Sequence, residues 1–184
     1  MSSFPRLPDP LTDGRVALRD YSERDIPEIL IAYQDDRRLH LLNGEERPPS
    51  GAELGGRAER EPALRAAGER ATLTVLEADS DTCRGQVRVI DADWDNGRAQ
   101  LAIWVAPQAR GRGLGTGALR LAGEWLLGAC RLDRLELLAE PDNAPVIAAA
   151  GAAGFVSEGV LRGYERKRGK RVDMAVLSLI PADL

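Results

Sequence analysis

The sequence predicts a mixed α/β (α+β) fold in which helices flank a mainly antiparallel central sheet. Three β-type runs, at residues 71–77, 84–91 and 98–105, follow one another with only short turn clusters between them, which favours an antiparallel meander. A helical pattern then separates residues 98–105 from another β-type run at 133–140. Because a helix connects these two strands, they can lie parallel to each other through a right-handed crossover.

The first part of the chain predicts one strand and two helices. Residues 15–20, "RVALRD", alternate apolar and polar side chains, which indicates a strand with one buried face. Asp25 and Glu28 have the spacing of a capping box and precede an apolar stripe, so we expect a helix to begin at Asp25. Ser50 and Glu53 have the same spacing ahead of an Ala-rich segment and predict the start of a second helix.

The last part of the chain predicts two helices and a hairpin. One helix is expected to begin near Thr116, and a short Ala-rich helix follows residues 133–140. Two final strands, near 155–162 and 172–180, are expected to pair as a hairpin. Residues 162–171, "RGYERKRGKR", form the only dense basic run of the chain. We interpret this run as the solvated tip of the hairpin, with an acidic protein or RNA partner as the alternative.

Length and composition are those of one globular domain. The chain has 184 residues, 43% hydrophobic and 29% charged, so we expect a single domain over residues 1–184 with a core over about 12–181. The net charge of −4 argues against a nucleic-acid partner. Cys83, Cys130 and the lone His40 have no metal-ligand spacing, so we expect no metal and two reduced thiols. The chain has neither a long apolar run nor a secretory signal, which predicts a cytoplasmic protein that does not insert into a membrane.

Four glycines at alternate positions, 111, 113, 115 and 117, stand between the third β-type run and a helical pattern. Backbone N–H groups at a helix N-terminus, together with the helix dipole, form an anion site, and phosphate is the biological anion that fits it best. The phosphate loop of kinases and ATPases does not match, because the chain has no Gly-Lys-Ser/Thr. A dinucleotide fingerprint can be aligned with Gly113, Gly115 and Ala118, but it should follow the first strand of its fold, whereas three β-type runs come directly before these residues.

The residues around this loop resemble the RimJ/RimL branch of the GNAT superfamily of N-acetyltransferases. Residues 110–115, "RGRGLG", fit the Arg/Gln-x-x-Gly-x-Gly/Ala pattern of the acyl-CoA loop in that superfamily, and they follow the strand as that loop does. The resemblance covers nearly the whole chain in five blocks that occur in the right order. They are "LTDGRVALRD", "GQVRVID", "LAIWVAPQARGRGLGTGALRLAGEW", "PDNAPVIAAAGAAGFVSEGVLR" and "RVDMAVLSL".

The resemblance implies an acetyl-CoA-dependent N-acetyltransferase in which a primary amine attacks directly in a ternary complex. It also implies a splayed parallel strand pair at the acyl-CoA site, where the strand before the loop separates from residues 133–140. The pyrophosphate would bind the loop, and the pantetheine would lie beside the preceding strand. The residues that the resemblance assigns to the cofactor are Ile103, Trp104, Val105, Arg110, Gly111, Arg112, Gly113, Leu114, Gly115, Thr116 and Asn143.

The residues that relatives use for proton transfer are not matched. The position of the usual general base is Gln100, and the position of the usual general acid, a tyrosine, is Ala150. Glu140 is the candidate proton acceptor. Asn143 is a candidate contact for the pantetheine or the acceptor, although an Asn after "PD" is equally typical of a helix N-cap. His40 is a further candidate base.

The acceptor is expected to be the primary amine of a protein N-terminus or of a small molecule, with walls from residues 34–70. Because both usual proton-transfer residues are absent, a non-catalytic protein that binds acyl-CoA or a small ligand is the alternative. The sequence leaves open the oligomeric state, a homodimer included, and the choice between acetyl and longer acyl groups.

Overall fold

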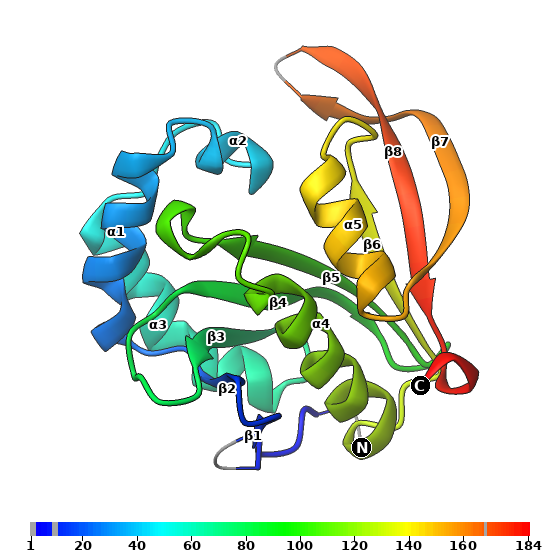
Figure 1. Ribbon diagram of the computed structural model, residues 1–184, viewed down its shortest axis with the longest axis horizontal. Coiled ribbons are helices and arrows are strands. Elements are labelled where there is room, and N and C mark those ends of the chain that lie inside the picture. The colour runs from blue at the N-terminus through cyan, green and yellow to red at the C-terminus, as the bar shows by residue number, and fades with distance from the viewer. Residues whose placement is uncertain (1–2, 9–10, 168) are drawn as a thin grey trace.

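The computed structural model describes residues 3–8, 11–167 and 169–184. Within them, eight strands form one sheet in the order β1-β2-β3-β4-β5-β6-β8-β7 (Figure 1). Every neighbouring pair is antiparallel except β5 and β6, which are parallel, so the expected mixed fold is confirmed. The strands are β1 (Leu11–Thr12), β2 (Val16–Asp20), β3 (Ala71–Glu77), β4 (Gly85–Asp93), β5 (Arg98–Val105), β6 (Arg134–Ala139), β7 (Val156–Lys167) and β8 (Lys170–Leu179).

Helices cover both faces of the sheet. α4 and α5 lie on the face toward the viewer in Figure 1, α1 and α3 lie on the other side, and α2 follows α1. A π-helical turn, Trp125–Ala129, continues α4. No helix in the described part of the chain is long and apolar enough to cross a bilayer. The helices are α1 (Ile26–Asp35), α2 (Leu39–Leu42), α3 (Gly51–Ala66), α4 (Leu114–Glu124) and α5 (Ala144–Ala152).

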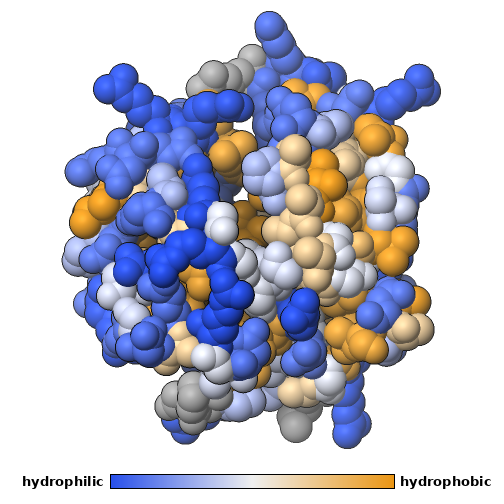
Figure 2. Space-filling view, viewed as in Figure 1, coloured by the Kyte–Doolittle hydropathy of each residue, from blue (hydrophilic) through white to orange (hydrophobic). Residues whose placement is uncertain are grey.

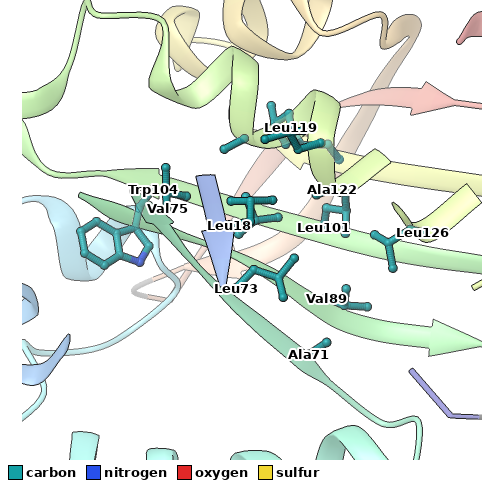
Figure 3. Packing of buried hydrophobic residues seen from close by; sticks show 14 of the residues in the cluster. Leu18, Ala71, Leu73, Val75, Val89, Leu101, Trp104, Leu119, Ala122 and Leu126 are labelled. Atoms are coloured by element: carbon teal, nitrogen blue, oxygen red, sulfur yellow. The ribbon is translucent and has the colours of Figure 1, made fainter. Parts of the chain in front are cut away.

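A layer of fully buried side chains fixes α4 on the sheet. Burying each Leu or Val side chain contributes about 1.5–3 kcal/mol to folding, so this layer holds the first turn of α4 in place beside β5. The layer, which Figure 3 shows, comprises Leu119, Ala122 and Leu126 from α4 and its continuation, and Leu18, Leu73, Val75, Val89 and Leu101 from the strands, each at most 1% exposed.

The parallel pair β5–β6 opens partway along β5. Its register ends at Leu101 opposite Leu137, and residues 102–105 pair only with β4, on the other edge of β5. The two strands therefore diverge beyond Leu101, as the resemblance implied.

Several expected elements have different ends. β7 extends to Lys167 and β8 begins at Lys170, so the basic run 162–171 lies mainly within the hairpin strands and not at its tip. Such a long ribbon can carry charged side chains along its length because a two-stranded arm exposes both faces over most of its course. Arg168, also part of the run, lies outside the described residues. α4 begins at Leu114, earlier than predicted.

Asp25 does not form the capping box predicted with Glu28. Its side chain is 1% exposed and accepts hydrogen bonds from Arg19 Nη2 at 2.6 Å and from Arg19 Nη1 at 2.9 Å. A buried carboxylate must be paired, and the neighbouring strand β2 supplies the arginine. The box predicted at Ser50 and Glu53 is confirmed, because the Ser50 N–H donates to Glu53 Oε2 at 2.8 Å and the Glu53 N–H donates to Ser50 Oγ at 3.3 Å.

Candidate functional site

A cleft of about 920 Å³ opens where β5 and β6 diverge. Figure 2 shows this hollow on the face toward the viewer, between a hydrophilic region on the left and a more apolar surface over α5. One part of the cleft is lined by β5, the glycine loop, the first turn of α4, the end of β6 and α5. Residues of α2, β4, β7 and the segment after α2 line the other part.

The glycine loop presents a row of free backbone N–H groups at the start of α4. Gly113 is the N-cap and has φ of +78°, in the left-handed region that glycine tolerates. Among the described residues, the N–H groups of residues 111–116 have no hydrogen-bond acceptor, and the Gly117 N–H is the first to bond, to Gly113 O at 3.0 Å. Free amides at the positive end of a helix dipole form an anion site.

The open edge of β5 adds two more free amides. The Ala106 N–H donates to Arg84 O, on the β4 side, at 2.8 Å. Successive N–H groups of a strand point to opposite edges, so those of Ile103 and Val105 point toward the gap between β5 and β6. No strand pairs with β5 on that edge beyond Leu101. The cleft therefore contains backbone donors on the loop and on the adjoining strand.

Both loop arginines are ion-paired. Arg110 Nη2 lies 2.6 Å from Asp36 Oδ2, and Arg110 Nε donates to Val105 O at 3.0 Å. Burial alone would raise the pKa of Asp36. The hydrogen bond from Arg110, the Arg38 backbone N–H and the charges of both arginines outweigh burial, so the pKa of Asp36 is lowered. Arg112 pairs with Glu77 and lines a second hollow outside the cleft. A phosphate at the loop would therefore share Arg110 with Asp36, whereas Arg112 is directed elsewhere.

Glu140 and Asn143 follow β6 and line the cleft. Glu140 Oε1 accepts a hydrogen bond from Lys167 Nζ at 2.8 Å, while its Oε2 has no partner within the described ranges. Asn143 stands at the N-cap position of α5, but its side chain makes no capping hydrogen bond. The amide of Asn143 is therefore free to contact a ligand.

The remaining predicted residues divide between the cleft and the interior. Gln100 lines the cleft from β5, but an amide cannot take up a proton. Ala150 is fully buried and does not line the cleft, and His40 also lies outside its lining although α2 borders it. His40 is thus not placed as a base. Trp104 lines the cleft, but its indole is buried and donates to Gln86 Oε1 at 3.2 Å, and its backbone pairs with β4.

Sequence reasoning missed the charged residues of the other part of the cleft. Arg88 lies on β4 between two buried valines, and this break in an apolar strand is the signal that could have revealed it. Glu165 and Lys167 are two residues apart on β7 and so share one face of the strand. Arg70 and Asn43 come from connecting segments without a periodic pattern. In the described chain, no group of three or more His, Cys, Asp and Glu residues could hold a metal ion.

Both cysteines are buried and free, which bears on any assay that measures thiols. Burial raises the pKa of Cys83 and of Cys130 to about 12, so the reactive thiolate is scarce near pH 8. We expect a chromogenic disulfide reagent to leave both thiols of the native protein unmodified at pH 8, and to modify both in denaturant. Rapid modification of the native protein would contradict this burial.

A mixed sheet with one diverging parallel pair lies beside a glycine loop whose amides are free, which is the arrangement that the sequence resemblance implied. The chain belongs to the acetyltransferase (GNAT) domain family, which it matches over residues 15–156.

Individual relatives agree with this family. The chain is 26% identical to the uncharacterized N-acetyltransferase p20 of Bacillus licheniformis over 113 residues, which are 61% of this chain and 64% of that protein. It superposes on Mycobacterium smegmatis RimJ in complex with CoA-disulfide with a TM-score of 0.76 and 22% identity, over 92% of this chain and 83% of that one. It superposes on spermidine N-acetyltransferase from Vibrio cholerae in complex with CoA and spermine with a TM-score of 0.77 and 20% identity, over 93% of this chain and 98% of that one. These two likenesses show the fold, and the family match confirms the expected membership of the GNAT superfamily.

Proposed function

We propose that this chain is an acetyl-CoA-dependent N-acetyltransferase that transfers an acetyl group to a primary amine in a ternary complex. The observation that carries the proposal is the row of free N–H groups at residues 111–116, next to the gap where β5 and β6 diverge. Membership of an acetyltransferase family supports it, as do the structures of two relatives that contain CoA or a CoA disulfide.

The donors and walls of the cleft fit a ligand with an anionic pyrophosphate and a long uncharged chain. The loop amides suit phosphate oxygens, and Arg110 adds positive charge at the rim. Beyond the loop, a Cβ on Gly115 would lie 3.6 Å from Val105 Cγ2 and 3.7 Å from Ala149 Cβ, so the passage there is narrow and apolar. When bound, acetyl-CoA supplies an acyl group activated as a thioester.

The residues of the chain supply the other requirements of direct acyl transfer. The N–H groups of Ile103 and Val105 point into the gap and can donate to an acyl carbonyl oxygen, a role in which preorganised donors accelerate acyl transfer. Glu140 Oε2 is free to accept the proton of the attacking amine, and the Asn143 amide is free to orient a reactant. Glu165 also lines the cleft, but it lies on β7, which β8 separates from β6. We therefore assign proton acceptance to Glu140.

A non-catalytic protein that binds acyl-CoA is the second candidate, and one observation favours it. Gln100 and the buried Ala150 occupy the positions of the usual base and acid, and no tyrosine lines the cleft within the described part of the chain. Release of free CoA thiol from acetyl-CoA in the presence of amines distinguishes the two candidates.

For an enzyme without a strong base at the usual position, the ionisation of the acceptor should decide which amines react. At pH 7 about a tenth of an α-amine is neutral, against less than about 0.1% of a lysine-type amine. We expect peptides with a free N-terminus to have kcat/KM at least about tenfold above N-terminally blocked lysine peptides at pH 7, and the gap to narrow at pH 9. The measurement is CoA release with each peptide. Absence of release with any amine, alongside tight acetyl-CoA binding, would favour the non-catalytic candidate.

A further inference from the structure

Arg88 places a guanidinium in the cleft without an acidic partner. It lies on β4 opposite Ala102 of β5 and lines the cleft. Its Nη2 donates to Asn43 Oδ1 at 3.0 Å, whereas its Nε is buried and has no partner among the described residues. Arg84, which directly precedes β4, is paired with Glu77. Arg88 is thus held in position by a neutral amide.

The acidic group that acts on Arg88 electrostatically is already neutralised. This group is Glu45, which accepts hydrogen bonds from Arg57 Nη1 at 2.6 Å and from the Tyr33 hydroxyl at 2.8 Å. Arg70 also lines the cleft, and it forms no ion pair within the described ranges. This wall therefore has an excess of positive charge, although the whole chain has a net charge of −4.

A half-buried guanidinium of this kind requires an anion. Burial lowers the pKa of Arg88, but a guanidinium stays protonated at neutral pH. Charged groups that leave water are normally paired, because desolvation otherwise costs several kcal/mol. The planar fork of an arginine matches the two oxygens of a carboxylate or phosphate. The missing partner of Arg88 is therefore a group of this shape.

We propose that the acceptor amine carries an anionic group, a carboxylate or a phosphate, which Arg88 binds while the amine faces Glu140. This inference rests on the proposed function and specifies its substrate class. A polyamine would bring further positive charges against Arg88 and Arg70. Spermidine, the acceptor named for the Vibrio cholerae relative, is accordingly the wrong class of acceptor for this chain.

Three pairs of peptides with the same N-terminal α-amine test the proposal, because each pair differs only in one anionic group. Ala-Ala against Ala-Ala-amide tests a terminal carboxylate, Ala-Glu-amide against Ala-Gln-amide a side-chain carboxylate, and Ala-phosphoserine-amide against Ala-Ser-amide a phosphate. In at least one pair we expect kcat/KM of the anionic peptide to be about 10- to 100-fold higher, the range for a hydrogen bond between charged groups. The pair that responds identifies the source of the anion.

Variants connect this preference to Arg88. In Arg88→Gln, kcat/KM of the anionic peptide should be within threefold of that of its neutral counterpart. The affinity of this variant for acetyl-CoA should stay within twofold of the wild type. Arg84 directly precedes β4 and does not line the cleft, so Arg84→Gln should keep the full preference for the anionic peptide. Arg88→Lys retains the charge without the fork and should give an intermediate ratio, and it replaces Arg88→Gln if that variant does not fold.

The outcomes separate this inference from the proposed function. Two results would overturn the inference and leave the acetyltransferase proposal intact. In the first, the wild type turns over both peptides of every pair with kcat/KM values within threefold of each other. In the second, the preference for the anionic peptide persists in Arg88→Gln. No CoA release with any peptide would overturn the acetyltransferase proposal. Calorimetric binding of the same peptides to the CoA-saturated protein, wild type against Arg88→Gln, would then still decide whether Arg88 binds the anion.

Discussion

Replacement of Glu140 by glutamine is expected to lower kcat by about 10²- to 10⁴-fold, the range for loss of general base catalysis, and to leave the affinity for acetyl-CoA unchanged. The amide of glutamine has the same shape, and its oxygen can still accept the hydrogen bond that Lys167 donates at 2.8 Å in the wild type. It cannot take a proton from the amine. With an α-amine acceptor, kcat/KM of the variant should rise with pH more steeply than that of the wild type until the pKa of the amine is approached.

Glu165→Gln is the matched control for this variant. Glu165 also lines the cleft and also contacts Lys167, at 3.4 Å, but from β7. The kcat of Glu165→Gln should stay within about threefold of the wild type, because Glu140 alone is assigned as the acceptor of the proton of the attacking amine. If Glu140→Gln itself loses less than threefold, Glu140 is an ordinary partner of Lys167, and water must carry the proton instead.

The parts of this molecule that the sequence predicts correctly are those fixed by local patterns. The strand runs at 71–77 and 98–105 have the predicted bounds, because alternation and turn residues act over a few positions. The glycine loop is found where the sequence places it, since Gly113 needs the left-handed backbone and the next residues begin a helix. The part of the cleft around the glycine loop, which we propose binds the cofactor, therefore follows from the sequence and the family resemblance.

The other part of the cleft, which we propose binds the acceptor, could not be predicted because it depends on contacts between distant segments. Arg88 reaches Asn43 across 45 positions of sequence. This pairing leaves no local pattern. The contact between Lys167 and Glu140 depends on the length of the β7–β8 hairpin. The dense charge of residues 162–171 is typical of a loop, so the sequence predicts shorter strands than the structure has.

The correction at Asp25 has a related cause. A spacing of three residues between an acidic pair is typical of a capping box, and it carries no information on burial. The structure instead uses this carboxylate to pair with Arg19 and to accept a hydrogen bond from the Thr74 hydroxyl at 2.7 Å. Both partners lie on neighbouring strands, so the role of Asp25 depends on the register of the sheet.

Replacement of Gly115 by valine is expected to weaken acetyl-CoA binding by roughly 100-fold while the protein stays folded. Valine retains the backbone N–H of this position, so the variant changes only the space available. Its Cβ would lie 3.6 Å from Val105 Cγ2 and 3.7 Å from Ala149 Cβ, which the fold tolerates, but its methyl groups would occupy the narrow passage between β5 and α5. Gly113 is a poorer test, because its φ of +78° would strain any substitution whether or not a ligand binds there.

Gly151→Val in α5 is the matched control, since a Cβ at that position meets nothing within 4 Å and the residue does not line the cleft. Both variants exchange glycine for valine within a helix, so their free energies of unfolding should stay within about 1 kcal/mol of the wild type. Only Gly115→Val should lose affinity in calorimetric titration with acetyl-CoA. A folded Gly115→Val protein whose Kd stays within threefold of the wild type would mean that acetyl-CoA does not pass between Val105 and Ala149. The free amides of the loop would then need a different ligand, because an anion bound there would not be attached to a chain that continues toward the gap between β5 and β6.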